Sequence, residues 1–430
     1  MQARETRRSF LKQGAALSVG VWAGTARRAW GQSPNEKLNI GAIGVGGRGH
    51  GDLHAVATEN IVAICDVDTG NLDRAASEFP AARKYVDYRQ LLQQNDLDAV
   101  VIGTPDHHHA PAAVRALRRG LHVYCEKPLT HTVREARVLT ELARQQGVAT
   151  QMGTQNHEHP GYMKVVEMIR SGAIGPVREV HVITDRPGRF WQQGLAVPTD
   201  EPPLPDSMKW DLWLGPAASR PYHPAYAPRA WRGWWDFGCG AIGDMAIHLM
   251  DPAFWALDLG GPVKVTSVGP PVLPACGPTE MISTFEFGPR GDFPACKVGW
   301  YEGLAKPPAE IADRLPMNGS LFIGDDGEIA VAHAEAPVLH QGGESTVQEI
   351  DADFDRRAHH HQQWITACKT GSSTGSHFGY AGPFTEIVLL GNVAYRTGEP
   401  IHYDPASMQI TNVPTANDLL NKEYRRGWEV

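Results

Sequence analysis

Short apolar runs recur through the first third of the chain, separated by longer stretches of mixed polarity. Runs of this kind, without alternation, are typical of strands that are buried on both faces of a parallel sheet. We predict such strands at residues 38–44, 60–65, 98–104 and 121–125, and helices at 50–58, 110–120 and 133–146. The alternation of strand and helix indicates an α/β domain with a doubly wound parallel sheet over residues 36–154.

The pattern changes after residue 155. A helix is predicted at 161–171 and a strand at 177–184, followed by a stretch rich in proline and tryptophan. Further strands are predicted at residues 263–268, 281–287, 295–301 and 320–323. Many turn residues separate these strands, which favours a large, mainly antiparallel sheet in a second domain over residues 155–430.

The loop after the first strand carries a glycine fingerprint with the sequence Gly44-Val-Gly46-Gly47-Arg48-Gly49. Glycines at this point permit a tight turn and let backbone N–H groups approach a pyrophosphate at a helix N-terminus. Asp66 ends the second strand, 22 residues after Gly44, where a carboxylate suits a ribose 2′-OH and repels a 2′-phosphate. The glycine pattern alone arises by chance in other α/β proteins, but here strand, loop, helix and acidic residue agree. They favour a Rossmann domain that binds NAD rather than NADP.

The third predicted strand ends in Thr104, Pro105 and Asp106, at the edge of the sheet where ligands of such folds bind. We therefore expect Thr104 and Pro105 to border the cofactor. Three histidines follow at 107–109, and His109 is a further candidate for contact with the cofactor or the substrate. The alternative is that the histidines cap the next helix and face water, and it is favoured because they lack metal-like spacing to other ligands.

Composition and charge exclude several classes of partner. The 430-residue chain has a formal net charge of −8 and scattered Lys and Arg residues after residue 30, so it presents no basic field for nucleic acid or an anionic membrane. Its six cysteines show no C-x-x-C spacing, although a Cys276–Cys296 pair stays open. No metal site is predicted, because the acidic and histidine-rich stretch at 351–361 follows no ligand spacing. We expect that stretch to be solvated and to lead into a helix at 362–368.

The first 31 residues resemble a twin-arginine export signal. Arg7 and Arg8 precede Ser9-Phe10-Leu11-Lys12 and an uncharged, small-residue stretch at 14–26 that is too short to span a membrane. We therefore expect a periplasmic or other extracytoplasmic protein, exported folded, with no stable membrane anchor. Because free NAD is scarce outside the cytoplasm, we expect the cofactor to be held tightly and recycled within the reaction cycle.

Tryptophan is concentrated in one region of the second domain. Six of the 12 tryptophans lie at positions 191, 210, 213, 231, 234 and 235. Flat aromatic faces stack well on the C–H faces of sugars, so the cluster suits a wall that faces carbohydrate. Packing of a loop-rich region, or a subunit contact, explains the cluster equally well.

A second glycine-rich segment, at 238–251, carries Asp244 and His248 four residues apart. On a helix, this spacing puts both side chains on one face. A carboxylate beside an imidazole can orient it and adjust its pKa toward neutrality, as a general base for an alcohol requires. Taken alone, the spacing favours a structural pair inside the core.

The chemistry-bearing residues form a recognisable combination. They are the fingerprint at 44–49, Asp66, Glu126-Lys127-Pro128, and Asp244 with His248. Together they resemble the Gfo/Idh/MocA oxidoreductases over nearly the whole mature chain. The resemblance implies an N-terminal Rossmann domain, a C-terminal α/β domain with an open sheet that often mediates oligomerisation, and action on sugars or polyols. Cys239 and Ala246 depart from the family pattern, which has glycine at these positions.

The resemblance also implies roles for individual residues. Lys127, which would lie beside the nicotinamide, would polarise the reacting hydroxyl, and His248 would remove its proton. Asp244 would position the substrate or the histidine. Glu126 would fix the cofactor loop, and Pro128 would follow a cis peptide.

Three functions are compatible with these motifs. The first is NAD-dependent oxidation of a secondary hydroxyl of a sugar, glycoside or polyol, by a homo-oligomer of two or four subunits. The second is NAD-dependent glycoside hydrolysis by transient oxidation and elimination, which needs an additional base, with Tyr301, His157 and His159 as candidates. The third is a non-catalytic sugar-binding protein, against which the intact catalytic residues argue.

Overall fold

The computed structural model describes residues 36–351 and 353–430, of which 37–430 form one compact unit. The export signal expected at residues 1–31 lies outside the described residues. Within the described ranges, no helix combines the length and the apolarity that crossing a bilayer requires.

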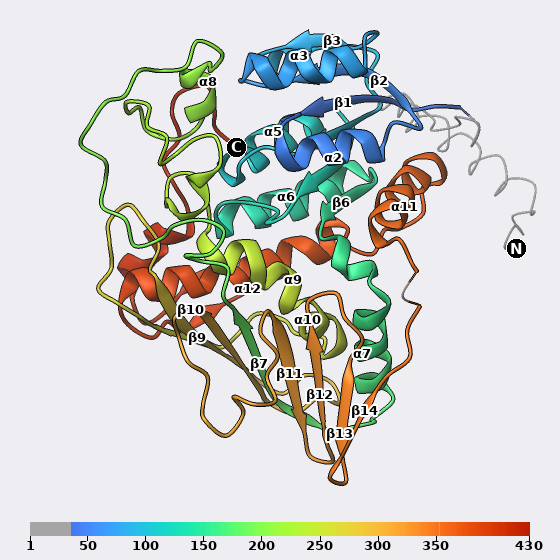
Figure 1. Cartoon of the computed structure of the whole chain (residues 1–430), viewed down its shortest axis with the longest axis vertical. Helices are drawn as coiled ribbons and strands as arrows, with labels where there is room; N and C mark the ends of the chain where they lie inside the picture. The colour runs from blue at the N-terminus through green and yellow to red at the C-terminus, as the bar shows by residue number, and fades with distance from the viewer. Residues whose placement is uncertain (1–35, 352) are drawn as a thin grey trace, which may run out of the picture. The chain divides into compact units, whose positions relative to one another are not determined.

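The N-terminal domain is built on a parallel sheet of six strands in the order β3-β2-β1-β4-β5-β6 (Figure 1). The strands are β1 Asn39–Ile43, β2 Asn60–Cys65, β3 Arg83–Tyr85, β4 Ala99–Ile102, β5 His122–Glu126 and β6 Thr150–Gly153. The helices are α2 Gly47–Ala55, α3 Thr69–Glu78, α4 Tyr88–Leu91, α5 His109–Arg118 and α6 Val133–Gln146. The predicted doubly wound sheet is confirmed. The carboxyl ends of β1, β2, β4 and β5 carry the fingerprint, Asp66, Thr104 and Lys127, respectively.

The C-terminal part contains a sheet of eight strands in the order β14-β13-β12-β11-β7-β10-β9-β8. The strands are β7 Val177–Thr184, β8 Lys264–Val268, β9 Glu280–Phe287, β10 Cys296–Gly303, β11 Gly319–Gly324, β12 Glu328–Ala332, β13 Val338–Gln341 and β14 Glu344–Val347. Only β7 and β10 pair in parallel, so the sheet is mixed and mostly antiparallel, as predicted. Alternate residues of β9 are buried, which indicates that one face of the sheet is packed against the body of the protein.

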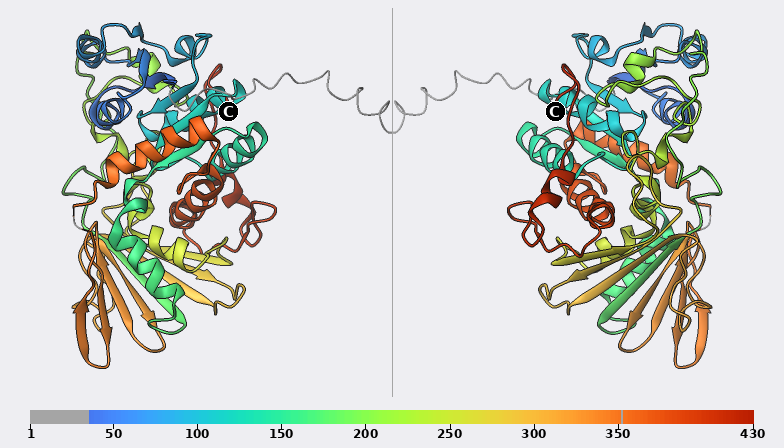
Figure 2. Two further views of the ribbon diagram at one scale, coloured as in Figure 1. Left: turned by 90° about the vertical axis from the view of Figure 1, so that its right-hand side faces the viewer. Right: turned by 90° about the vertical axis from the view of Figure 1, so that its left-hand side faces the viewer.

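The C-terminal part also contains helices. They are α7 Pro160–Arg170, α8 Trp210–Leu214, α9 Ile247–Leu249, α10 Asp251–Ala256, α11 Arg356–Thr370 and α12 Phe378–Thr397, with a π-helix at Ile242–Ala246. The long α12 crosses between the sheets and contacts both α6 and β8 (Figures 1 and 2). Short 3₁₀ turns lie at Asp106–His108, Gln155–Glu158, Ala230–Gly233 and Pro414–Leu420, and β15 Tyr403–Asp404 pairs with β16 Gln409–Ile410.

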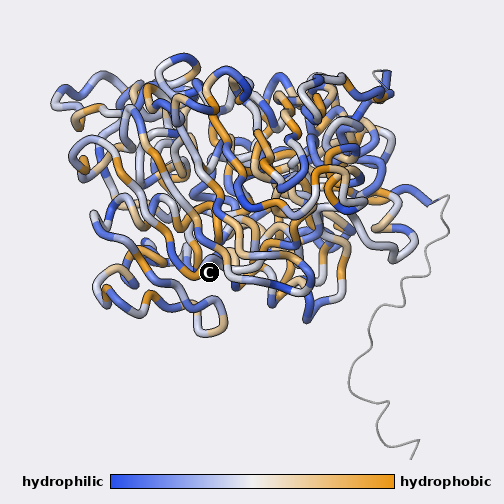
Figure 3. The backbone as a smooth tube through the Cα atoms, turned by 90° about the horizontal axis from the view of Figure 1, so that it is seen from below, coloured by the Kyte–Doolittle hydropathy of each residue, from blue (hydrophilic) through white to orange (hydrophobic). Residues whose placement is uncertain are grey.

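Helix α11 completes the core of the N-terminal domain although it lies late in the chain. Trp364 and Ile365 are buried in one hydrophobic cluster with Ile40 and Val101 of the parallel sheet. The solvated segment expected before residue 362 is therefore partly wrong: the helix begins at Arg356, and Asp355 accepts hydrogen bonds from its first turn. In the hydropathy view, apolar stretches run through the interior of the chain trace (Figure 3).

The buried histidines of α11 explain this difference. His360 and His361 are fully buried. The His360 ring nitrogen Nε2 lies 2.9 Å from the carbonyl oxygen of Met152, and that of His361 lies 3.1 Å from Asp52 Oδ1. Polar partners from the N-terminal domain therefore make these histidines part of its core, and no local sequence signal carries that information.

Candidate functional site

The glycine loop has the backbone geometry that a bound pyrophosphate requires. Gly44 and Gly47 have φ values of +78° and +49°, which favour glycine. A Cβ at Gly49 would overlap the carbonyl oxygen of Gly44, so helix α2 can begin this close to β1 only with glycine there. The residues fit NAD for two reasons. The loop presents backbone N–H groups at the start of α2. In addition, a cavity is lined by four residues of the loop, Gly44, Gly46, Gly47 and Arg48.

Asp66 lies at the carboxyl end of β2 and lines the same cavity. Its Oδ2 accepts a hydrogen bond from Val45 N at 3.0 Å, and its Oδ1 accepts one from Asp68 N at 2.8 Å. Burial raises the pKa of Asp66 to about 6. The carboxylate is thus tied to the glycine loop, in the position from which it can accept hydrogen bonds from a ribose.

The cavity has a volume of about 520 Å³ and runs from Asp66 to the predicted catalytic residues. Its lining includes these expected contacts: Thr104, Pro105, Glu126, Lys127 and His248. The structure therefore brings the cofactor and catalytic candidates of both domains to one cavity, with His109 and Asp244 outside its lining.

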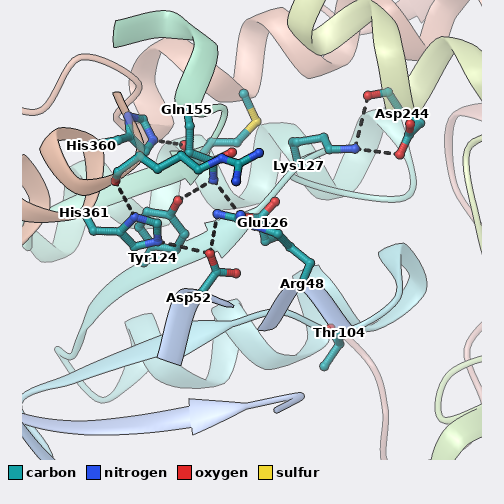
Figure 4. Close-up of polar contacts among 12 residues, drawn as sticks. Arg48, Asp52, Thr104, Tyr124, Glu126, Lys127, Gln155, Asp244, His360 and His361 are labelled. Atoms are coloured by element: carbon teal, nitrogen blue, oxygen red, sulfur yellow. Dashed lines mark hydrogen bonds and ion pairs between the residues drawn. The ribbon is translucent and has the colours of Figure 1, made fainter. Parts of the chain in front are cut away.

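Lys127 follows β5 and is joined to Pro128 by a cis peptide bond, as the resemblance implied. Its Nζ donates hydrogen bonds to Asp244 Oδ1 at 2.6 Å and to the Asp244 carbonyl oxygen at 3.2 Å (Figure 4). Arg232, which the sequence analysis missed, donates from Nε to the same Oδ1 at 3.0 Å. Burial alone would raise the pKa of Asp244, but Lys127 and Arg232 hold it well below its usual range.

The helix that carries Asp244 and His248 is a π-helix at Ile242–Ala246 followed by a short α-helix, rather than the regular α-helix expected. The hydrogen bonds of the Asp244 carboxylate go to Lys127 and Arg232. Its coupling to His248 is electrostatic. The Asp/His pair therefore interacts through charge and not through a hydrogen bond between the two side chains. Single-turn π-bulges of this kind are frequent at functional sites.

His248 is held in its neutral form. Burial and the nearby positive charge of Lys127 lower its pKa well below the usual value, and the Asp244 carboxylate only partly opposes them. Its Nδ1 is buried and has no hydrogen-bond partner among the described residues. The His333 ring lies edge-on to it, 5.6 Å away. A neutral imidazole beside a lysine can accept a proton from a hydroxyl that the lysine contacts.

A buried polar network supports the loop behind Lys127 (Figure 4). Glu126 Oε1 accepts hydrogen bonds from Arg48 Nε at 3.1 Å and from Gln155 Nε2 at 2.8 Å. Arg48 also forms an ion pair with Asp52 at 2.6 Å, and His361 contacts the same Asp52 oxygen. The predicted role of Glu126 as a support for the loop agrees with these contacts. Asp52 and His361 were missed, because only the fold brings α2 and α11 together.

The three histidines after β4 neither face water nor share one role. His107 and His108 are buried, and each has a ring nitrogen within 3.0 Å of the carbonyl oxygen of Trp213. His109 has its two ring nitrogens 2.7 Å and 2.9 Å from the carbonyl oxygens of Pro128 and Thr104. The solvated helix-cap interpretation is therefore wrong. A direct contact between His109 and the cofactor stays a prediction, and the structure gives this histidine a bridging position between two cavity-lining loops.

Some residues of the tryptophan cluster only pack a loop-rich region, and others also face the cavity. Trp210, Trp213, Trp231 and Trp234 pack in one hydrophobic cluster, so most of the cluster supports a loop-rich region. Trp213 and Trp231 also line the cavity. The guanidinium of Arg232 lies 4.4 Å from the ring centre of Trp231, which fixes this aromatic face beside the Lys127–Asp244 pair.

The remaining candidates lie away from the cavity lining. Neither Tyr301 nor His157 nor His159 lines it. Tyr301 stacks on His181, and His157 lies 2.9 Å from Asp251. All six cysteines are buried and unpaired, so the open question of a Cys276–Cys296 pair is answered in favour of free thiols.

Comparisons with known proteins agree with this geometry. The family of oxidoreductases with an NAD-binding Rossmann fold matches residues 38–154, and the C-terminal α/β domain of the same family matches residues 162–274. An inositol 2-dehydrogenase of Salmonella paratyphi B is 31% identical over 150 residues, which are 34% of this chain and 45% of that protein. A glycosyl hydrolase family 109 protein of Shewanella sp. (strain ANA-3) is 32% identical over 202 residues, which are 39% of this chain and 43% of that protein.

The fold is also that of solved structures. An aldose-aldose oxidoreductase from Caulobacter crescentus superposes with a TM-score of 0.61 at 17% identity, covering 85% of this chain and all of the other. The chain spans less than half the length of the two curated relatives. The two domain matches, the fold and the NAD-binding cavity agree, and the chain belongs to the Gfo/Idh/MocA family of oxidoreductases with an NAD-binding Rossmann domain.

Proposed function

We propose that this protein is an exported, NAD-dependent oxidoreductase that oxidises a secondary hydroxyl of a sugar, glycoside or polyol. It keeps its NAD bound and regenerates it by reducing a second carbonyl substrate. The observation that carries this proposal is the arrangement of Lys127, Asp244 and His248 at the far end of the cavity that Asp66 borders.

Each residue of the site has a separate role in the proposed reaction. NAD, held by the glycine loop and Asp66, would supply the acceptor for the hydride of the carbon that carries the hydroxyl. Lys127 donates a hydrogen bond to the hydroxyl oxygen, and neutral His248 accepts its proton. Asp244 holds the lysine in place. When a second carbonyl substrate takes the hydride and the proton, the protein returns to its starting state.

The substrate class is supported by the site and by the names of relatives. Trp213 and Trp231 supply aromatic faces at the cavity, and polar residues surround them. One relative is an inositol 2-dehydrogenase, a polyol enzyme by name, and one structural neighbour is an aldose-aldose oxidoreductase. The latter name describes transfer between two sugars. Such a transfer returns the bound cofactor to its starting redox state, which an exported enzyme needs because free NAD is scarce outside the cytoplasm.

The first experiment measures the cofactor. Protein purified without added nucleotide is denatured, and the released dinucleotide is identified by mass spectrometry and quantified per chain. One equivalent of NAD, with turnover of paired sugars in the absence of added NAD, is the expected result. Turnover only with a continuous supply of NAD would contradict the recycling part of the proposal.

NAD-dependent glycoside hydrolysis is the second candidate, and the similarity to a glycosyl hydrolase family 109 protein favours it. It requires a base for the neighbouring C–H, and none of the three bases suggested from sequence lines the cavity. His333 lies edge-on to His248, with ring centres 5.6 Å apart, and is a further candidate for that role, although it too lies outside the cavity lining. Net release of a leaving group from a nitrophenyl glycoside, without net oxidation of the sugar, would favour this candidate over the first.

Export and assembly are separate proposals. Replacing Arg7 and Arg8 by lysine is expected to retain the protein in the cytoplasm, which fractionation would measure. We also propose a dimer or tetramer, as the family resemblance implies, and light scattering of the purified protein tests it.

A further inference from the structure

The part of the cavity around Asp66 is covered by chain segments from distant parts of the sequence. The chain just after β2 forms two backbone hydrogen bonds with the chain just before α8: Lys209 N donates to Val67 O at 2.8 Å, and Thr69 N donates to Ser207 O at 2.9 Å. Met208 and Leu212 of this covering chain line the cavity. The covering chain is therefore fastened next to the carboxylate that suits a ribose.

A third segment, at 425–428, fastens α8 from the other side. Arg425 Nε donates to the carbonyl oxygen of Gly215 at 2.7 Å, and its terminal nitrogens contact the carboxylate and carbonyl oxygens of Asp211 at 2.5 Å and 2.6 Å. The backbone of Arg425 also donates to Pro216 O at 3.1 Å. One arginine thus connects this late segment to both the start and the end of α8.

Three residues later, Trp428 reaches the cavity itself. It is 4% exposed and lines the cavity. Tyr88 and His108 meet its ring edge-on, with ring centres 5.7 Å and 5.5 Å away. The guanidinium of Arg89 lies 4.0 Å from the ring centre and is held by a bidentate ion pair with Asp87. The indole is therefore fixed by contacts on several sides while it borders the cavity.

The strand order indicates which part of NAD lies there. Lys127 follows β5, the fingerprint follows β1 and Asp66 follows β2. Strand β3 lies at the edge of the sheet, and Tyr88, the first residue of α4, comes shortly after it. A dinucleotide with its nicotinamide at Lys127 and its pyrophosphate at the fingerprint places its adenosine ribose at Asp66. The adenine then continues toward the loop after β3, where Trp428 packs against Tyr88.

We propose that Trp428 is an aromatic wall of the adenine subsite, and that the segment at 425–428, fastened to α8 by Arg425, closes the NAD site and slows release of the cofactor. This inference rests on the proposed function, because it requires that the cavity binds NAD. A flat indole offers a stacking face for adenine, and the interlocked segments must separate before the adenosine half can leave. The device suits an enzyme that carries its cofactor through export.

The test measures exchange and fragment binding, not turnover. Protein loaded with NAD is mixed with isotopically labelled NAD, and the exchange rate is followed by mass spectrometry. Separately, AMP and nicotinamide mononucleotide compete for the site in nucleotide-depleted protein. We expect Trp428→Ala to weaken AMP competition about tenfold, to leave nicotinamide mononucleotide unchanged, and to accelerate exchange, with Trp428→Phe close to wild type.

Arg425→Ala tests the fastening, and Arg178→Ala is its matched control. Arg178 likewise pairs with an aspartate, donating to the Asp325 carboxylate at 2.7 Å and 2.9 Å, and like Arg425 it does not line the cavity, but it makes no contact with α8. Faster exchange in the Arg425 variant alone is the expected result.

Three results would overturn the inference, and they are distinguishable from a failure of the proposed function. Unchanged AMP competition in Trp428→Ala contradicts the adenine wall. Equal weakening of AMP and nicotinamide mononucleotide shows a general effect on the fold. Equal exchange in the two arginine variants contradicts the fastening. Wild-type protein that binds no NAD at all would instead contradict the proposed function.

Discussion

The ammonium group of Lys127 lies 2.6 Å from the Asp244 carboxylate, although 117 residues separate the two in the chain. Arg232 approaches the same oxygen at 3.0 Å, so two cations share one anion. The excess positive charge lies beside His248, which is neutral. The cations stabilise the negative charge that develops on the hydroxyl oxygen and so help the hydroxyl to lose its proton, while the charge of Lys127 also keeps the imidazole in the neutral form that can accept one.

Removal of the lysine ammonium is the most direct test of this arrangement. We expect Lys127→Ala to reduce kcat by about 10²- to 10³-fold, the usual cost of removing one group that stabilises developing negative charge, while NAD stays bound. Lys164→Ala is the control, because Lys164 forms only a surface pair with Glu167. Single-turnover reduction of bound NAD measures the effect, and turnover near the wild-type rate would remove Lys127 from the reaction.

Asp244→Asn is expected to destabilise the protein by about 1.5–3 kcal/mol at neutral pH, because two partly buried cations lose their counter-charge. The pKa of Asp244 in the folded protein lies below its ordinary value of 3.8, so the stabilisation is present above about pH 4 and is lost as the pH falls further. Urea unfolding between pH 3 and 7 measures this dependence. Asp325→Asn, at an exposed ion pair, is the control. A difference in stability that does not shrink at low pH would contradict the assignment.

The pH profile tests the state of His248. A base is active in its neutral form, and the lowered pKa keeps His248 neutral below the pH at which an ordinary histidine gains its proton. We therefore expect kcat/KM to stay constant from pH 8 down to about 6 and to fall only at lower pH. His248→Gln should lose most activity, whereas His359→Gln, at an exposed position of α11, should not. An acid limb centred near pH 6.5 would contradict this prediction.

Asp66→Asn tests the basis of the preference for NAD. Asparagine keeps an oxygen for the hydrogen bond from Val45 N but removes the charge that repels a 2′-phosphate. We expect the affinity for NADP to rise by about tenfold relative to NAD, equivalent to about 1.4 kcal/mol. Dissociation constants for both dinucleotides measure it, with the exposed Asp73→Asn as the control. An unchanged ratio would mean that another residue selects the cofactor.

Where local signals were complete, the sequence predicted the elements well. Helix α6 occupies the predicted 133–146, because Thr132 and Glu135 form a capping box at its start and Gly147, with φ of +64°, ends it. Strand β7 occupies the predicted 177–184. The bounds of α6 are set by the capping residues next to it, so they are readable without the rest of the fold.

Helix α12 was missed for the opposite reason. Its 20 residues include Pro383 and several glycines, and almost every side along its length is buried. A helix that is packed on all sides has no amphipathic period to detect. The neighbours that hold it, α6 and the strands β8 and β9, come from other parts of the chain.

The sequence by itself determined the residues that need a particular local chemistry: the glycines of the fingerprint, Asp66 at a strand end, and Glu126-Lys127-Pro128 after β5. The interpretation of the fingerprint and Asp66 follows from backbone conformation and from their place at the carboxyl edge of a parallel sheet, whereas the roles of Glu126, Lys127 and Pro128 were implied by the resemblance to the family. The tertiary structure decided which charges meet. Arg232 shares Asp244 with Lys127, and Trp428 borders the cavity of Asp66, only because packing brings distant segments together. Such contacts depend on the whole core, and no short stretch of sequence contains them.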